Sequence, residues 1–534
     1  MKANPNRFWG TVILLGWLFD FLFWKKPLGV NFAVFVALCL ASGIFLLRLD
    51  GLRLARVSGL LLFPIAFLAA MTFLRLEPMT AFLSICMTVF LMGVLALTYL
   101  NGQWSRYTLL DYIIGYLRLF ASMIARPIGL ISETRRDPSS NDQTHRKSTH
   151  IWSIVRGIVI ALPVIAIFAS LLSSADPIFA NRIEGFIDLL NIENLPEYIF
   201  RLVYILVIAY ALAGTYLHAA QKSDEVVEEK AWIAPFLGFT ESAIVLGSVL
   251  ALFIAFVIIQ FQYFFGGQAN INIDGYTFSE YARKGFGELV TVAFFSLLLL
   301  LGLGAITRRE NEFQRRIFSS LGIALVGLVI VMLISAYQRL VLYETAYGFS
   351  RLRTYTHVFM IWLGLLLVVV VALELTRREH AIGLAMLFAA LGFIVSLGLL
   401  NVDSFIVERN IQREIDRLEE NATSGDGIAL DAQYFLGLSG DAVPSLVNAY
   451  QDTSLPDTVR EEVGASLACI HYTRNQEEGE LPWQSFHFSR YFADLAFEEV
   501  SDDLDTYKIN AEDSTVSVES PGGEEFSCSQ YYYD

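Results

Sequence analysis

Long apolar runs alternate with short polar stretches over the first 400 residues of the chain. Eleven runs approach the length needed to cross a bilayer, whose hydrocarbon core of about 30 Å requires about 20 helical residues. Because backbone polar groups must pair internally in lipid, each run is predicted to be a helix. The predicted spans are 8–24, 29–47, 57–74, 78–100, 151–173, 199–220, 239–265, 285–306, 317–337, 354–375 and 380–400. The pattern therefore predicts an all-α polytopic membrane protein with about eleven transmembrane helices.

A more polar segment separates the first four spans (1–104) from a seven-span core (151–400). Residues 105–130 are apolar in part but contain Asp111, Arg118 and Arg126, which predicts an amphipathic helix lying in the membrane interface. Residues 132–149 are polar and rich in turn formers, so 105–150 is predicted to be an interfacial helix followed by a cytoplasmic loop. The first span follows Lys2 and Arg7 as in a signal peptide, but no small-x-small cleavage motif follows it, which favours an uncleaved helix.

The placement of Lys and Arg predicts the orientation. One set of loops holds about twice as many basic residues as the other, and basic loops remain in the cytoplasm. The N-terminus is therefore predicted to be cytoplasmic and, with eleven spans, the C-terminal domain extracytoplasmic. One miscounted span reverses the second conclusion.

The last 134 residues differ sharply in composition from the rest. They contain 28 Asp and Glu against seven Lys and Arg, a net charge of −21 within a chain of net charge −15. Residues 401–499 show spacings typical of short amphipathic helices, with Pro444 at a helix start, and are predicted to form a small helical soluble domain. Residues 500–534 are expected to be an acidic, weakly structured tail. An acidic tail on a mildly basic membrane part argues against a nucleic-acid partner.

The chain shows none of the common local signatures of catalysis. It lacks a phosphate-binding P-loop, His-Glu-x-x-His, Cys-x-x-Cys and Gly-x-Ser-x-Gly, and its seven His are scattered. We therefore expect no metal site, no cofactor and no catalytic residues. Cys469 and Cys528 are the two cysteines of the tail and could form a disulfide if the tail lies outside the cytoplasm.

Four acidic residues fall within predicted spans, where ionisable groups are costly and often functional. They are Asp20, Glu241, Glu288 and Glu374. Asp20 and Glu374 lie near span ends, where snorkelling to the interface is cheap. Glu280, Lys284 and Glu288 share one helix face, which is either an intrahelical ladder of ion pairs or the wall of a polar cavity.

Two stretches combine Tyr, Arg and Glu at a predicted membrane surface, 260–289 and 335–357. On the predicted topology both face outward, together with the end of the fifth span. Their bland interpretation is interfacial anchoring by Tyr and Arg. Their functional interpretation is one exoplasmic polar site, composed of Asp176, Tyr263, Glu280, Tyr281, Arg283, Glu288, Arg339, Tyr343, Glu344, Arg351, Arg353 and His357.

Several pieces of the sequence, in order, resemble a family of bacterial membrane proteins known as domain of unknown function 4173, related to the 4153 group. They are SADPIF at 174–179, YFFGG at 263–267, YARKGFGEL at 281–289, RLVLYETAYG at 339–348, NVDSFI at 401–406, LSGDAVP at 438–444 and WQS at 483–485. The resemblance covers roughly residues 150–490. It implies a multi-pass protein of the bacterial inner membrane, without an activity or catalytic residues to carry over.

Three functions fit these observations. The leading hypothesis is a non-enzymatic membrane protein whose outward polar site binds a small ligand, a lipid headgroup or an envelope protein. A small-solute or ion-coupled transporter is the second, with Glu288 lining a path, although no inverted repeat is evident. The third is an intramembrane enzyme acting on lipid-linked substrates, with Asp176, Glu280, Glu344 and His357 as acid–base groups.

Overall fold

The computed structural model describes residues 4–136, 194–221, 235–264, 286–378, 381–420, 429–477, 481–512 and 515–529, with separate positions between 161 and 179. Its membrane helices are α1 (Pro5–Phe23), α2 (Val30–Leu49), α3 (Arg56–Gly59), α4 (Leu62–Leu74), α5 (Pro78–Thr98), α6 (Leu109–Arg136), α9 (Leu195–Ala219), α10 (Phe239–Phe264), α13 (Phe286–Ile306), α14 (Glu312–Tyr347), α15 (Arg351–Leu375) and α16 (Ile382–Leu400). The C-terminal part contains α17 (Val402–Glu420), α18 (Val443–Gln451), α19 (Asp457–Glu477), α20 (Phe488–Leu504), β1 (Lys508–Glu512), β2 (Thr515–Glu519) and β3 (Glu525–Ser527).

Ten helices among the described residues are long and apolar enough to cross a membrane. Nine coincide with predicted spans, which confirms the all-α polytopic class. The predicted first span is α1, a helix of 19 residues that is not among the ten, and the predicted span 151–173 falls almost wholly outside the described residues.

The tenth helix is the segment Leu109–Ser132 of α6, which was expected to lie in the interface. Its length and composition are sufficient for a span, because Asp111, Arg118 and Arg126 are spread among enough apolar residues. Its exposed apolar side chains recur every three or four residues, as in a helix with one lipid-facing stripe. They include Ile113, Leu117, Phe120, Ile124 and Ile128.

The chain divides into two compact units. The first comprises residues 1–24, 41–51 and 119–220, and in it α1 packs along α9. The second comprises residues 25–40, 52–118 and 221–534, and it contains α3 to α5, α10, α13 to α16 and the C-terminal domain, whereas α2 and α6 are divided between the two units.

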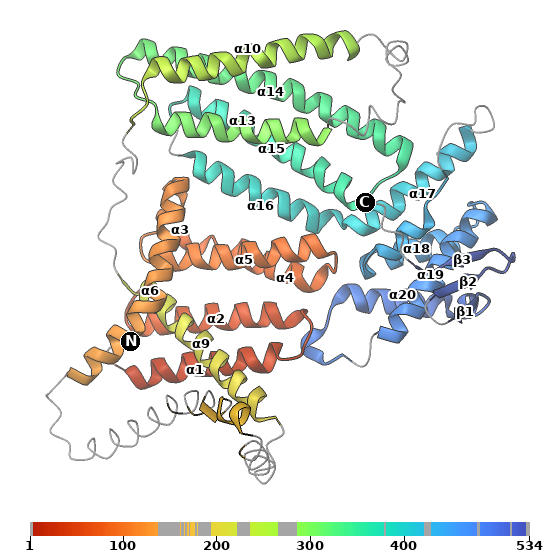
Figure 1. Ribbon diagram of the computed structural model, residues 1–534, viewed down its shortest axis with the longest axis horizontal. Coiled ribbons are helices and arrows are strands. Elements are labelled where there is room, and N and C mark those ends of the chain that lie inside the picture. Colours follow the sequence, from red (N-terminus) through yellow and green to blue (C-terminus); the bar gives the residue numbers. More distant parts are fainter. Residues whose placement is uncertain are drawn as a thin grey trace. The chain divides into compact units, whose positions relative to one another are not determined.

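In the second unit, α10 and α13 both pack against α14, α14 packs against α15, and α15 packs against α16; these helices run from yellow-green to cyan in Figure 1. Their shared core is made of aliphatic and Met side chains such as Leu297, Val329, Leu340 and Leu367, each at most 2 % exposed. The elements α17 to α20 and the strands gather at one end of these helices (Figure 1). Asn401, in the left-handed conformation at a φ of 52°, separates α16 from α17.

The C-terminal domain has its own core, in which Phe435, Leu446, Val463 and Leu467 are buried. Pro444 lies in the first turn of α18, as predicted. The expectation of a weakly structured tail over 500–534 is wrong for 508–527, where β1, β2 and β3 form an antiparallel sheet in that order. The register pairs Val518 with Ile509 on one side and Phe526 on the other, and Val518 enters the domain core.

Candidate functional site

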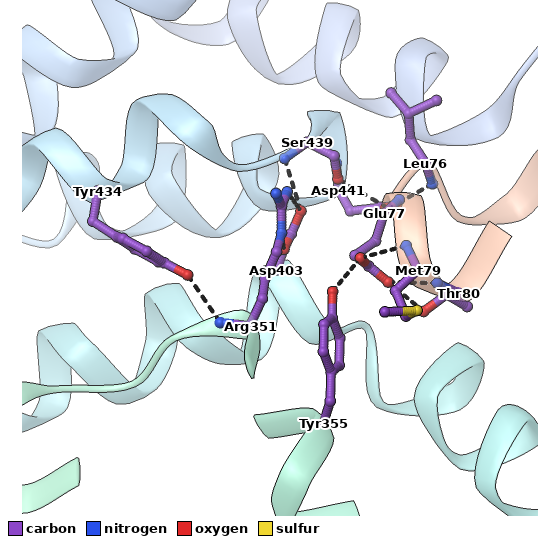
Figure 2. Close-up of polar contacts among 10 residues, drawn as sticks. All are labelled: Leu76, Glu77, Met79, Thr80, Arg351, Tyr355, Asp403, Tyr434, Ser439 and Asp441. Carbon is purple, nitrogen blue, oxygen red and sulfur yellow. Dashed lines mark hydrogen bonds and ion pairs between the residues drawn. The ribbon is translucent and has the colours of Figure 1, made fainter. Parts of the chain in front are cut away.

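A buried network of charged and polar groups joins the ends of the membrane helices to the C-terminal domain (Figure 2). Arg351, the first residue of α15, donates two hydrogen bonds to Asp403 on α17, from Nε at 2.7 Å and Nη2 at 2.6 Å. Asp403 is completely buried and also accepts from the backbone N–H of Ser439 at 2.7 Å. The backbone N–H of Arg351 donates to the Tyr434 hydroxyl at 2.9 Å. A bidentate pair between Arg and a carboxylate is strong and fixes the relative orientation of its partners.

The turn between α4 and α5 is held to the C-terminal domain by a second carboxylate. Asp441 accepts from the backbone N–H groups of Leu76 at 2.6 Å and Glu77 at 3.0 Å, and is 5 % exposed. Burial raises the pKa of Asp441 above its ordinary value, although these bonds and Arg75 oppose the shift. The contact therefore joins segments separated by more than 360 residues in the sequence.

Glu77 serves as the N-cap of α5 and connects it to α15. Its carboxylate accepts from the backbone N–H groups of Met79 at 2.8 Å and Thr80 at 2.7 Å, and from the hydroxyl of Tyr355 (Figure 2). The first backbone N–H groups of a helix have no carbonyl partner within the helix, and an N-cap side chain of this kind supplies the acceptor. The network thus holds α5, α15 and α17 together at one end of the bundle.

Asn410 of α17 makes two hydrogen bonds to the turn between α14 and α15. Its Oδ1 accepts from the N–H of Phe349 at 2.6 Å, and its Nδ2 donates to the carbonyl of Phe349 at 3.0 Å. Gly348 precedes this residue with a φ of 79°, and a Cβ at this position would lie 2.6 Å from Oδ1 of Asn410. Only glycine combines that backbone conformation with that close approach.

Glu344 and His357 face one another across this turn, one on α14 and one on α15. Nδ1 of His357 lies 3.1 Å from Oε1 of Glu344, with side-chain exposures of 16 % and 2 %. The ring of Tyr337 packs against the imidazole at a centroid distance of 4.6 Å. Nε2 of His357 and Oε1 of Glu344 are both buried and have no hydrogen-bond partner within the described part of the chain. The contact between the two side chains has the distance of an ion pair, and it leaves an imidazole nitrogen and a carboxylate oxygen available to a further group.

The two arginines of the predicted site that lie beside this pair are already engaged. Arg351 forms its ion pair with Asp403. The Cζ atom of Arg353 lies 4.2 Å from the centroid of the Tyr343 ring, and its guanidinium donates a hydrogen bond to the Gly348 carbonyl. Of the predicted site residues, the ends of α14 and α15 bring together Tyr343, Glu344, Arg351, Arg353 and His357; Arg339 lies one turn earlier on α14.

The other predicted site residues are not brought to this place by the described structure. Glu288 is exposed near the start of α13. Asp176 is exposed and belongs to the other compact unit. Tyr263 is in the last turn of α10, and its side chain is outside the described structure, as are residues Glu280, Tyr281 and Arg283.

The partners of Asp20, Glu374 and Glu241 within the protein are defined by the described structure. In the first unit, Asp20 is 3 % exposed and accepts from Nε of Arg201 at 2.9 Å and from the Tyr204 hydroxyl, so it does not snorkel to the interface. Glu374 accepts from the Ser319 hydroxyl at 2.6 Å. Glu241 accepts from the N–H of Gly238 at 2.8 Å at the start of α10. These contacts support structural roles.

Cys469 of α19 and Cys528, which follows β3, form a disulfide in the structure, with Cα atoms 5.4 Å apart. The bond ties the sheet to the helical core of the C-terminal domain.

The sequence did not predict Glu77, Tyr355, Asn410 or Tyr434 as part of the site. The one local signal among them was Glu77 directly before Pro78, a pattern typical of a helix start.

The carboxylates of the network lie within one region matched by a family model. A family model described as a domain of unknown function, DUF4153, matches residues 62–449, from α4 into α18. The chain belongs to the DUF4153 family. The DUF4153 region contains Glu77, Glu344, His357, Asp403 and Asp441. No curated protein and no solved structure matches the chain.

Proposed function

We propose that this DUF4153 protein is a non-catalytic, multi-pass protein of the bacterial inner membrane that binds a polar ligand at Glu344 and His357. The C-terminal domain lies outside the cytoplasm and is seated on the outward end of the helix bundle. The sequence pieces described above favour a place close to the related 4173 family. The observation that carries the proposal is the buried Glu344–His357 pair, whose Nε2 has no hydrogen-bond partner in the described structure.

The contacts of the C-terminal domain support the proposed orientation without a count of every span. Four turns contact this domain, at 25–30, 75–80, 348–351 and 400–403, so they lie at the same end of the helices of the second unit. Helix α1 precedes the first of these turns. Its 19 residues give a length of about 28 Å, sufficient to cross the hydrocarbon core. If α1 spans, the N-terminus and the C-terminal domain are on opposite sides of the membrane.

The chemistry of the pair suggests the kind of ligand. Oε1 of Glu344 and Nε2 of His357 both lack a hydrogen-bond partner in the described structure, so the pair offers a carboxylate oxygen and an imidazole nitrogen to a ligand. The carboxylate oxygen would accept a hydrogen bond from an O–H or N–H group of the ligand. Arg351 and Arg353 are occupied by protein groups, so the guanidinium forks that recognise phosphate are not free at this place. A hydroxylated or amine-bearing lipid headgroup meets these requirements and reaches the site from the membrane surface.

Native mass spectrometry of the protein extracted from its membrane in a mild detergent tests the proposal. We expect the wild type to retain a lipid adduct that is lost from Glu344→Gln and His357→Phe. The control is Arg377→Ala, which breaks the exposed pair with Glu312 on another part of the helices and should retain the adduct. Identical adducts in all four proteins would refute the site.

A further inference from the structure

The C-terminal domain carries an exposed apolar surface where it meets the membrane helices. It is formed by the segment before α20 and the first two turns of that helix. Its members are 39 % to 59 % exposed, and we refer to them as the aromatic edge: Trp483, Phe486, Tyr491, Phe492 and Leu495. Contiguous apolar surface of this kind is unusual on a water-soluble domain and marks an interaction site.

The aromatic edge is fixed to the ends of two membrane helices. The N–H of Val30, the first residue of α2, donates to the carbonyl of Phe486 at 2.9 Å. The hydroxyl of Ser485 donates to the carbonyl of Pro27 at 3.0 Å. A Cβ at Gly29 would lie 2.6 Å from the Phe486 carbonyl oxygen, so the two backbones are in close contact.

A second attachment comes from α4. The ring of Phe73, near the C-terminal end of this helix, packs against the ring of Phe488 at a centroid distance of 5.9 Å. The start of α2 and the end of α4 are places where apolar helices leave the hydrocarbon core. The aromatic edge is therefore held at the depth where the membrane-spanning segments end.

The two faces and two ends of α20 differ in the way expected of a helix lying on a membrane. One face, with Ala493, Phe497 and Val500, is buried in the domain core. The exposed face is mainly apolar in its first two turns, where Asp494 is the exposed acidic residue and pairs with Arg474 at 2.8 Å. Beyond them it becomes acidic, with Glu498, Glu499 and Asp502 exposed. Apolar residues are thus confined to the end nearest the spans, and the distal end is suited to water.

We infer that the aromatic edge is embedded in the headgroup layer of the bilayer that the helices span. Trp and Tyr are favoured at this depth because their rings are amphipathic, and interfacial helices bury their apolar face about 5–10 Å into the boundary. The C-terminal domain is then a partly membrane-seated domain rather than one surrounded by water. The inference does not depend on which side of the membrane the domain occupies or on the proposed ligand site.

Nitroxide labelling in vesicles tests this inference. The full chain, with Cys39→Ala and Cys86→Ala and with the Cys469–Cys528 disulfide intact, is labelled at Phe492→Cys and reconstituted in phosphatidylcholine and phosphatidylglycerol. Collisions with oxygen, which concentrates in lipid, are compared with those with a water-soluble nickel chelate. The matched control is Asp502→Cys, an exposed position farther along the same helix.

We expect the label at position 492 to collide several-fold more with oxygen, relative to nickel, than the label at position 502. Trp483→Cys, at the other end of the aromatic edge, should behave like Phe492→Cys. Equal ratios at 492 and 502 would mean that the surface is in water and would overturn the inference. Protection from both reagents at 492 would mean that a protein covers the surface, which overturns it as well. Non-reducing gels verify that each variant keeps the disulfide.

Discussion

Arg351 and Asp403 form a bidentate ion pair that joins the start of α15 to the start of α17, and the carboxylate has no exposed surface. The pair connects the last turns of the membrane bundle to the C-terminal domain. Because both partners also bond to the backbone or hydroxyls of that domain, the pair positions it rather than merely neutralising charge. The first prediction concerns this pair.

Replacing Asp403 by Ala should destabilise the protein strongly. Removing Asp403 leaves the Arg351 guanidinium, whose side chain is 24 % exposed, without its carboxylate, which costs up to about 3 kcal/mol. Unfolding of the purified protein by denaturant in detergent measures the loss. The matched control is Arg377→Ala, whose pair with Glu312 is 56 % and 60 % exposed and should contribute less than about 1 kcal/mol. Equal losses in the two variants would contradict the assigned role of Asp403.

Acid should weaken the attachment at the start of α20 through His487. Burial, assisted by the charge of Arg490, lowers the pKa of His487 from 6.5 to about 4. The unfolded chain therefore binds the proton more tightly than the folded one between these values. Stability is complete above pH 6.5 and falls as the pH drops toward 4, by up to about 3 kcal/mol.

The variant His487→Asn tests this assignment. The ring accepts from the N–H of Ser489 at 3.2 Å, and an Asn side chain retains an acceptor for that group without a titrating proton. Unfolding midpoints at pH 7 and pH 5 should differ less in the variant than in the wild type. An unchanged difference would assign the acid sensitivity to another residue.

A rise in pH from 4.5 to 7 should weaken the C-terminal domain through Glu462. Burial, assisted by the nearby charges of Glu414 and Glu524, raises the pKa of Glu462 from 4.5 to about 7. The folded state retains the proton in this range, so stability falls as the pH rises from 4.5 through 7. Glu462→Gln should make the domain more resistant to denaturant at pH 8 and flatten its dependence between pH 4.5 and 7. The exposed-site variant Glu498→Gln should keep the wild-type slope; a slope unchanged in Glu462→Gln would exclude that carboxyl as the cause.

Loss of the disulfide should destabilise the domain. Cys469 and Cys528 are 59 residues apart, and closing a loop of that length restricts the unfolded chain by about 4 kcal/mol. Cys469→Ser with Cys528→Ser should lower the unfolding midpoint and speed proteolysis of β1 to β3. Alkylation in intact cells before lysis reports whether the thiols are bonded there. Freely alkylated thiols in the wild type would show that the bond does not form in the native compartment.

The sequence predicted the membrane class because an apolar run long enough to span is a strong local signal. Nine spans were located in this way. Helix α6 was not expected to span, because its three charged residues suggested an interfacial helix although the apolar segment is long enough to cross the membrane. The strands of the tail were missed because acidic residues obscure the alternation of Val516 and Val518. These errors concern segments in which polar and apolar signals compete.

The candidate site was predicted only in part, for a different physical reason. Glu344 and His357 stood out as ionisable groups near a membrane surface. Their neighbours Asp403 and Glu77 did not, because the partners of these carboxylates are distant in the sequence: Arg351 is 52 residues from Asp403, and Tyr355 is 278 residues from Glu77. Periodicity reports contacts between residues three or four apart, and it carries no information on such pairs.

The side of the membrane occupied by the C-terminal domain is the most direct test of the account. Two reporters are fused separately after Asp534. Alkaline phosphatase is active only outside the cytoplasm. Green fluorescent protein fluoresces in the cytoplasm but not after export by the general secretory route. We predict an active phosphatase and a dark fluorescent protein, with the N-terminus cytoplasmic. An inactive phosphatase with a bright fluorescent protein would place the domain and the Glu344–His357 pair on the cytoplasmic side and contradict the proposed outward-facing site.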